Sequence, residues 1–314
     1  MLSSTAKNLY WIGRYIERAE NAARVLEAAE RIALLSPPDA GHDREWMSVA
    51  AIYDCRESFL KAHEGGSLES LLHFMTLDAD SATSIFASVR QARDNGRAER
   101  NNLTVDVWET LNGFWLELQA IARQRHAGRD WRGLLDWIKK QANLVTGAAH
   151  QTMLRDEAFS FLSLGTYIER ADNTARILDV KYHILLPQGE RIGGSVDYYH
   201  WGEILACISA YRTYRRVYAS AIEPWRVAEL MILNRNLPRS LHFAHRRIDA
   251  HLNELAEFHG QRHEAHRLAG ELYAQLRYGK IDMIFGAGLH EFLEEFMERN
   301  AVLSGQIARD YLME

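Results

Sequence analysis

One stretch of this sequence occurs twice, and it constrains the fold more than any other feature. Residues 1–34 align without a gap with residues 153–186, and fifteen of the thirty-four positions are identical. In both copies apolar residues recur at the three-to-four-residue spacing of one helix face. The chain is therefore expected to contain two equivalent long helices. The identities gather in Gly13-x-Tyr15-Ile16-Glu17-Arg18-Ala19-x-Asn21-x-Ala23-Arg24-x-Leu26 and Gly165-x-Tyr167-Ile168-Glu169-Arg170-Ala171-x-Asn173-x-Ala175-Arg176-x-Leu178.

The two copies also share a polar stripe, which lies nearly opposite the apolar one on a helix. A face open to water gives no physical reason for polar residues to stay matched. We therefore expect both faces of each helix to be covered by other parts of the chain. The matched polar residues are Glu17, Asn21 and Arg24 in the first copy and Glu169, Asn173 and Arg176 in the second.

The rest of the sequence favours an all-α fold. It contains only five prolines, and apolar residues recur at helical spacing through most of its length. We predict a single compact helical domain over residues 1–314, with about a dozen helices in two halves, residues 1–150 and 151–314, related by a pseudo-twofold axis. Individual helices are predicted over residues 44–63, 102–125, 131–151 and 201–220.

A second matched segment extends the repeat beyond one helix. Its two copies lie 156 residues apart, and we predict Asp80 and Asn236 as the N-caps of the helices that follow. The copies are Leu77-Asp78-x-Asp80-x-x-x-Ser84-Ile85 and Leu233-Asn234-x-Asn236-x-x-x-Ser240-Leu241.

Charge and cysteine usage exclude several classes of protein. A net charge of −5 gives no general basic field for nucleic acid or anionic lipid, and no window approaches the eighteen apolar residues of a membrane span. Cys55 and Cys207 lie at non-equivalent places in apolar helical patterns, so we interpret them as small core residues. The sequence reaches its first repeat helix at once and leaves no room for a signal peptide. We expect a cytoplasmic protein that binds neither nucleic acid nor membrane.

The Glu-Arg pairs allow two interpretations. Adjacent residues such as Glu17 and Arg18 point about 100° apart on a helix, so each needs another partner. In the structural interpretation, the Glu and Arg of one repeat pair with those of the other in a buried network, because buried charges must be paired. In the functional interpretation, matched residues line a cleft that binds a carboxylate or phosphate. The candidate binding residues are Glu17, Arg18, Asn21, Arg24, Glu169, Arg170, Asn173 and Arg176.

Simpler roles exist for some of these residues. Glu20 with Arg24, and Asp172 with Arg176, have the spacing of ordinary i, i+4 ion pairs. If the cleft were catalytic, Glu17 would act with its equivalent as acid and base or accept an amine.

Other candidate chemistry is sparse. His259-x-x-x-His263-x-x-His266 has a spacing that would place three imidazoles on one helix face, as a metal site requires, but a solvated basic face is the favoured interpretation. We therefore predict no metal and no cofactor. Phosphate-loop and serine-hydrolase motifs do not occur in the sequence, and no catalytic residue is assigned. Gly13 and Gly165 lie inside helices, where close approach of another backbone is the expected reason for glycine.

The repeat motifs resemble those of the bacterial alpha-E domain family, a helical domain of unknown function named for its helices and its Glu-Arg motif. The resemblance covers essentially the whole chain, and the family motif maps onto Glu17, Arg18, Glu169 and Arg170. It is carried by Tyr10-Trp11-Ile12-Gly13-Arg14-Tyr15-Ile16-Glu17-Arg18-Ala19-Glu20-Asn21 and by Leu164-Gly165-x-Tyr167-Ile168-Glu169-Arg170-Ala171-Asp172, preceded by Met153-Leu154-Arg155-Asp156-Glu157.

This resemblance implies partners rather than an activity. Alpha-E proteins are typically encoded beside, or fused to, a circularly permuted ATP-grasp protein, often near a transglutaminase-like protease. Our first hypothesis is a non-catalytic partner of an ATP-grasp amide or peptide ligase that binds a peptide or carboxylate in the Arg/Glu cleft. The second is an enzyme of the same pathway, an amide-bond transferase or hydrolase. The sequence shows no arrangement of nucleophile and base, which favours the first.

Overall fold

The structure is a computed structural model that describes residues 1–35, 47–63, 66–124, 128–183 and 195–313. Fifteen α-helices and a short π-helical turn form the regular structure of these ranges, in which no strand occurs. The predicted all-α fold is therefore confirmed.

The helices follow each other in two series. Those described in the first series are α1 (Ser3–Leu35), α2 (Met47–Ile52), α3 (Arg56–Ala62), α4 (Leu68–Thr76), α5 (Ile85–Ala98), α6 (Val105–Ala122) and α7 (Trp131–Thr152). Those described in the second are α8 (Glu157–His183), α9 (Ser195–Cys207), α10 (Tyr211–Tyr218), α11 (Pro224–Ile232), α12 (Leu241–His259), α13 (Glu264–Tyr278), α14 (Ile281–Ala287), α15 (Leu289–Ile307) and the π turn η2 (Ala308–Leu312).

The helix bounds repeat along the chain. α4 and α11 begin 156 residues apart, and so do α5 and α12. A residue of α8 is equivalent to the residue of α1 that lies 152 positions before it. Residues in the segment from α9 to α10 are equivalent to those 155 positions earlier, in the segment from α2 to α3. Residues in the segment from α11 to α12 are equivalent to those 156 positions earlier, in the segment from α4 to α5. That this order reflects a duplication, with halves at 1–150 and 151–314, stays a prediction.

Two of the predicted helices are each broken in two. The helix predicted over 201–220 is divided between α9 and α10, and the one predicted over 44–63 between α2 and α3, its residues 44–46 lying outside the described residues. Each break turns at a residue with left-handed backbone, Asp54 (φ 50°) and Ser209 (φ 56°). The next residue in each, Cys55 or Ala210, donates its N–H to the carbonyl five residues earlier, at 2.9 and 2.7 Å. The breaks are therefore equivalent in geometry, although neither contains a Gly or Pro from which a break could be predicted.

The predicted N-caps, Asp80 and Asn236, were wrong. The N-caps of α5 and α12 are Ser84 and Ser240, whose hydroxyls each accept the N–H three residues later at 3.0 Å. Asp80 and Asn236 instead belong to preceding turns, in which each N–H donates to the side chain two residues earlier at 2.9 Å. A serine in extended backbone directly before the helix satisfies the first free N–H groups better than a residue four positions upstream.

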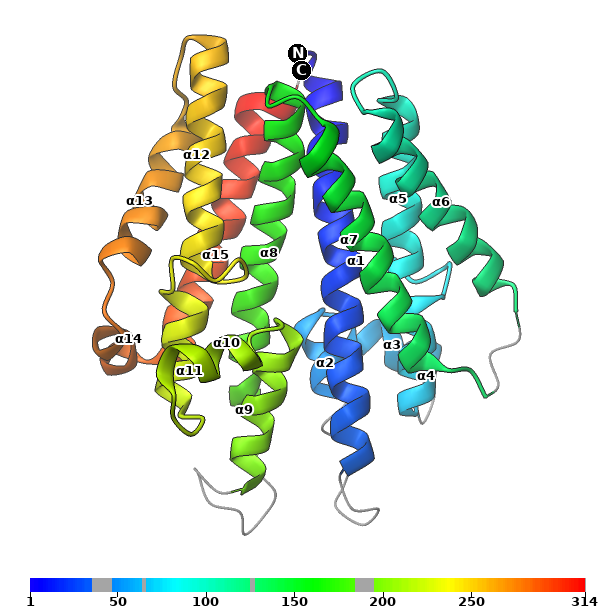
Figure 1. Cartoon of the computed structure of the whole chain (residues 1–314), viewed down its shortest axis with the longest axis vertical. Coiled ribbons are helices and arrows are strands. Elements are labelled where there is room, and N and C mark those ends of the chain that lie inside the picture. The colour runs from blue at the N-terminus through cyan, green and yellow to red at the C-terminus, as the bar shows by residue number, and fades with distance from the viewer. Residues whose placement is uncertain (36–46, 64–65, 125–127, 184–194, 314) are drawn as a thin grey trace.

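α1 and α8 form the centre of the fold. They lie side by side in Figure 1, and their mutual contact is the most extensive between any two described helices. α5 and α7 pack against α1, while α12 and α15 pack against α8. The two termini lie close together at one end, and α2 to α4 and α9 to α11 surround the other (Figure 1). The apolar stripes of α1 and α8 belong to the buried core.

Two glycines let α1 and α8 approach closely. A Cβ added to Gly13 would lie 2.0 Å from the carbonyl oxygen of Leu162, and one added to Gly165 would lie 1.9 Å from that of Tyr10. These contacts are reciprocal, because Leu162 is the equivalent of Tyr10. The predicted close approach of another backbone at both glycines is confirmed, and no residue with a side chain fits this crossing.

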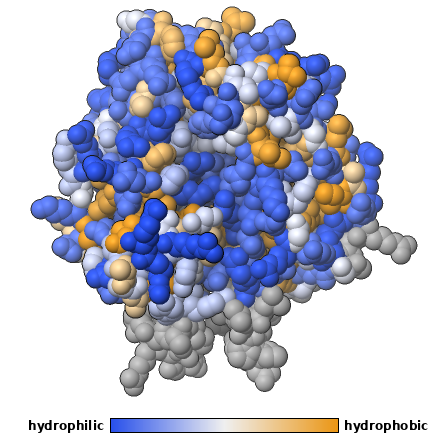
Figure 2. Space-filling model, in the orientation of Figure 1, coloured by the Kyte–Doolittle hydropathy of each residue, from blue (hydrophilic) through white to orange (hydrophobic). Residues whose placement is uncertain are grey.

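The cysteines and the helix surfaces complete the fold. Cys55 and Cys207 are buried and free, as expected of small core residues. None of the described helices is both long and apolar enough to cross a bilayer. The face shown in Figure 2 is mostly hydrophilic, and its apolar residues occur in small separate groups.

Candidate functional site

The glutamates and asparagines of the polar stripes of α1 and α8 are buried. Glu17 and Asn21 are each 2% exposed, and Glu169 and Asn173 are each 3% exposed. The expectation that both faces of the repeat helices are covered is therefore confirmed. Because an ionised carboxylate is costly to bury, each of these glutamates needs cationic partners within the protein.

Each glutamate binds the arginine of the other repeat. Arg18 donates from Nε and Nη2 to the two carboxylate oxygens of Glu169, at 2.7 and 3.1 Å. Arg170 donates in the same way to Glu17, at 3.0 and 2.6 Å. Both pairs have the bidentate geometry that makes Arg-carboxylate hydrogen bonds strong and specific. The buried reciprocal network of the structural interpretation is present, whereas binding of a ligand by these residues stays a prediction.

A second arginine completes each pair, and the sequence analysis missed both. Arg14, one turn before Arg18 on α1, lies 2.7 Å from Glu169, and Arg239, in the turn before α12, lies 2.9 Å from Glu17. The two come from non-equivalent positions. The equivalent of Arg14 is Thr166, and the residue equivalent to Arg239 is Thr83. Comparison of the repeats finds matched residues, so it passes over an arginine present in one copy alone.

These ion pairs keep both glutamates charged. Burial alone would raise the pKa of Glu17, but Arg170 and Arg239 outweigh it and hold the pKa at about 2. Burial likewise opposes ionisation of Glu169, yet Arg14 and Arg18 lower its pKa. A general acid or base needs a pKa near the working pH. Neither carboxylate is poised for proton transfer in this arrangement.

The remaining arginines of the repeat motif reach the helix breaks. Arg24 donates to the Ser209 hydroxyl at 2.7 Å, and Arg176 donates to the Ile52 carbonyl at 3.4 Å. Each also forms the predicted i, i+4 ion pair, with Glu20 at 2.6 Å and Asp172 at 2.7 Å. Each repeat helix thus holds the break that belongs to the other series of helices.

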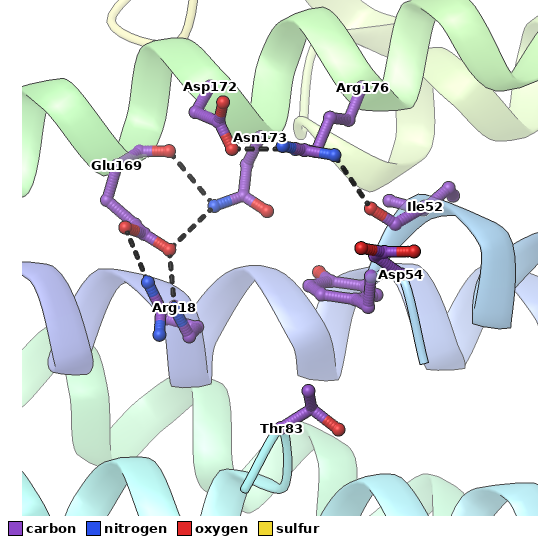
Figure 3. Close-up of a pocket in the computed structure, with 9 residues that line it drawn as sticks. Arg18, Ile52, Asp54, Thr83, Glu169, Asp172, Asn173 and Arg176 are labelled. Carbon is purple, nitrogen blue, oxygen red and sulfur yellow. Dashed lines mark hydrogen bonds and ion pairs between the residues drawn. The ribbon is translucent and has the colours of Figure 1, made fainter. Parts of the chain in front are cut away.

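A pocket of about 160 Å³ opens beside Glu169 (Figure 3). Its walls come from α1, the break between α2 and α3, the turn before α5, and α8. Four of the eight predicted binding residues line it, while the other four surround the equivalent place, which Arg239 fills. The lining residues are Arg18, Ile52, Tyr53, Asp54, Thr83, Glu169, Asp172, Asn173 and Arg176.

The pocket offers groups for binding rather than for covalent chemistry. Its hydroxyls belong to Thr83 and Tyr53, and no histidine or cysteine is among its lining residues. Burial raises the pKa of Tyr53 well above its usual range, so this phenol stays neutral. Within the described residues the Tyr53 hydroxyl makes no hydrogen bond and the Thr83 hydroxyl pairs with that of Ser81, so neither is hydrogen-bonded to the base that an activated nucleophile requires. What the pocket presents is a set of charged and polar groups that can recognise a polar ligand.

The three histidines do not share a helix face, so that prediction was wrong. α12 ends at His259, Gly260 follows with φ 68°, and α13 begins after His263. His266 is buried, and both of its ring nitrogens hydrogen-bond to backbone atoms, at 2.9 Å each. Within the described residues no group of three or more His, Cys, Asp or Glu side chains is placed to hold a metal ion.

These features define an all-helical domain built on a buried Glu-Arg motif that occurs once in α1 and once in α8. The chain belongs to the alpha-E family, described as a predicted alpha-helical domain with a conserved ER motif, which matches residues 1–312. Among its curated relatives are the uncharacterised proteins Mb2597 of Mycobacterium bovis and Rv2567 of Mycobacterium tuberculosis, each 26% identical over 310 residues. The alignments cover 92% of this chain and 34% of each relative, so the chain spans about a third of their length. No solved structure matches it.

Proposed function

We propose that this chain is a non-catalytic partner of an ATP-grasp amide or peptide ligase system, and that it holds a peptide or carboxylate group of the substrate in the pocket beside Glu169. One observation carries the proposal. The motif carboxylates Glu17 and Glu169 are buried, ionised and saturated by arginines, while the adjoining pocket presents binding groups without an activated nucleophile. Such a site suits recognition better than bond making.

The relatives support a partner role. About two thirds of each mycobacterial protein lies outside the region that matches this chain, as expected of a domain that works beside other domains. The resemblance to the alpha-E family supplies the class of partner, a circularly permuted ATP-grasp protein, with a transglutaminase-like protease as a further one. Because such a ligase consumes ATP, we place the system in the cytoplasm.

The test is to purify the chain together with an ATP-grasp protein encoded beside it. Co-elution, with a faster peptide-dependent ATP turnover by the ligase when this chain is added, is the expected result. Absence of both would overturn the proposal. Formation or hydrolysis of an amide bond by the isolated chain would overturn it too, in favour of an amide-bond transferase or hydrolase of the same pathway.

Substitution of motif arginines separates folding from function. Arg18→Lys and Arg170→Lys keep the charge but lose the bidentate geometry. We expect both variants to have a lower melting temperature, because the pairs hold α1 and α8 together. Of these two arginines, Arg18 lines the pocket and Arg170 does not, so Arg18→Lys should also weaken stimulation of the ligase at temperatures where both variants are folded.

A further inference from the structure

The two equivalent sites of the network differ at one position. Thr83 and Arg239 each directly precede the N-cap of an equivalent helix, α5 or α12. The Arg239 guanidinium is buried, donates to Glu17 at 2.9 Å and to Asn21 at 2.6 Å, and forms an ion pair with Glu20 at 2.8 Å. Threonine is too short to reach so far, and the pocket of about 160 Å³ lies where the equivalent arginine would be.

The acceptors that hold the Arg239 guanidinium all have counterparts around this pocket. Glu169, Asp172 and Asn173 are the equivalents of Glu17, Glu20 and Asn21, and all three line it. Asn173 donates from Nδ2 to the Glu169 carbonyl at 2.9 Å, which turns its Oδ1 towards the pocket (Figure 3). This residue is 3% exposed, and its Oδ1 accepts no hydrogen bond within the described residues. In the equivalent site the Asn21 Oδ1 accepts the shortest bond from Arg239.

Two further groups in the pocket are available to a ligand. Asp54, the equivalent of Ser209, adds a carboxylate at the pocket mouth and forms no ion pair with any described residue. The Tyr53 hydroxyl is buried and also makes no hydrogen bond within the described part of the chain. A buried polar atom without a partner, such as the Tyr53 hydroxyl oxygen, destabilises the folded state. A ligand that donates several hydrogen bonds and carries positive charge would satisfy both groups.

Charge points to a cation as well. The site around Glu17, which the Arg239 side chain fills, carries one net positive charge. Its three arginines are Arg24, Arg170 and Arg239, and its two carboxylates are Glu17 and Glu20. Around the pocket, three of each cancel: Arg14, Arg18 and Arg176 against Asp54, Glu169 and Asp172. One bound cation would bring the pocket to the charge that the filled site already carries.

We propose that the pocket beside Thr83 binds a guanidinium group, in the position that the Arg239 side chain takes in the equivalent site. A cavity of about 150 Å³ is enough to hold benzene, and guanidinium is planar and smaller. Its fork of N–H donors suits several acceptors at once, as the contacts of Arg239 show, whereas an ammonium is a compact point charge. This inference deepens the peptide alternative of the proposed function and excludes the carboxylate alternative for this pocket. The guanidinium group would belong to an arginine side chain of the peptide substrate. Free arginine offers the same chemistry.

The test is calorimetric titration of the isolated chain with N-acetyl-arginine amide. N-acetyl-citrulline amide, which is uncharged and has nearly the same shape, is the matched ligand. We expect citrulline to bind at least tenfold more weakly, because one charged hydrogen-bonding group is worth about 1.5–3 kcal/mol. Equal affinities, or no binding of either, would overturn the proposal. Titration with free L-arginine and with a peptide containing an internal arginine distinguishes the two sources.

Variants locate the site. Thr83→Arg places the chain's own guanidinium in the pocket and should abolish arginine binding while the melting temperature stays the same or rises. Asp54→Asn should weaken binding several-fold without lowering the melting temperature, since Asp54 has no ion pair to lose within the described residues. Asp282→Asn, an exposed acid on α14, is its control and should bind normally. Unchanged affinity in both pocket variants would contradict the proposal.

The reverse exchange covers the case in which Thr83→Arg fails to fold. Arg239→Thr should lower the melting temperature and open a second pocket of the same kind. Guanidinium chloride at low millimolar concentration should then raise the melting temperature of Arg239→Thr more than that of the wild type, with sodium chloride as the ionic-strength control. Equal responses would count against the proposal. These measurements use the chain alone, so the two proposals can fail separately. Arginine binding without stimulation of the ligase would refute only the proposed function. Stimulation of the ligase without arginine binding would refute only this inference.

Discussion

The sites around Glu17 and Glu169 solve the same physical problem in two ways. Each buries a carboxylate that one bidentate arginine from the other repeat cannot fully compensate, and each adds a second arginine. At Glu17 that arginine, Arg239, approaches from the turn before α12 and fills the space beside the network. At Glu169 it is Arg14, which comes from within α1, so the corresponding space stays open. The network therefore stabilises the fold at both sites, and it leaves room for a ligand only at the site around Glu169.

The largest expected loss of stability comes from removing the arginine that pairs with the more deeply buried glutamate. Arg170→Leu leaves the Glu17 carboxylate, whose side chain is 1% exposed, with Arg239 as its one ion-pair partner among the described residues. We expect the free energy of unfolding to fall by about 3 kcal/mol, the lower end of the range for breaking a buried ion pair. Arg18→Leu should cost less, about 1–2 kcal/mol, because Arg18 is 29% exposed and water in the pocket can solvate Glu169. Urea unfolding measures both, and equal losses would remove the distinction.

Acid should weaken the network in a defined window. The pKa of Glu17 falls from 4.5 to about 2 on folding, so its ionisation favours the folded state above pH 4.5. This contribution, on the order of 3 kcal/mol, is lost as the pH falls from about 4.5 to about 2, where the carboxylate becomes protonated in the folded chain too. Glu17→Gln should flatten the pH dependence of unfolding across that window. The same slope in wild type and variant would contradict the assignment.

The helix crossing should tolerate no side chain. Gly13→Ala or Gly165→Ala puts a Cβ within about 2 Å of a backbone carbonyl, so α1 and α8 must separate. We expect a loss of about 1–3 kcal/mol from each, as for overpacked cores. Gly147→Ala, on α7 with nothing within 4 Å of the added atom, is the control and should be neutral or stabilising by up to about 1 kcal/mol. A loss as large in the control would assign the effect to something other than the crossing.

The smallest losses of stability are expected from the arginines that contact the helix breaks. Arg24→Lys removes a donor to Ser209 and should cost up to about 1 kcal/mol, since its side chain is 13% exposed. The equivalent change Arg176→Lys should cost less, because that side chain is 38% exposed and surface ion pairs contribute little. Thermal unfolding of the two variants gives the order, and the reverse order would contradict the difference in burial.

Much of the fold could be predicted because its evidence is periodic or repeated. The apolar stripe, the matched polar stripe and the glycines of α1 and α8 follow from comparing residues 1–34 with 153–186. That comparison led directly to buried pairs such as Glu17 with Arg170. The family resemblance rests on the same residues.

What sequence comparison missed has no periodic signal. The turns at Asp54 and Ser209 contain neither glycine nor proline, so each predicted helix ran straight through its break. Arg239 was overlooked because its equivalent is Thr83, one of four unmatched positions in the segment from Leu77 to Ile85. The histidines were misplaced because Gly260, which ends α12, lies between them.

A double-mutant cycle on Glu17 and Arg170 tests the central claim most directly. The claim is that these side chains stabilise the fold through each other, across the contact of α1 with α8. If so, the unfolding free energies of Glu17→Gln, Arg170→Leu and the double variant should show a coupling of at least about 1.5 kcal/mol, within the range for residues in one buried network. Losses that add to within about 0.5 kcal/mol would show that the pair does not act as a unit, and would contradict the account.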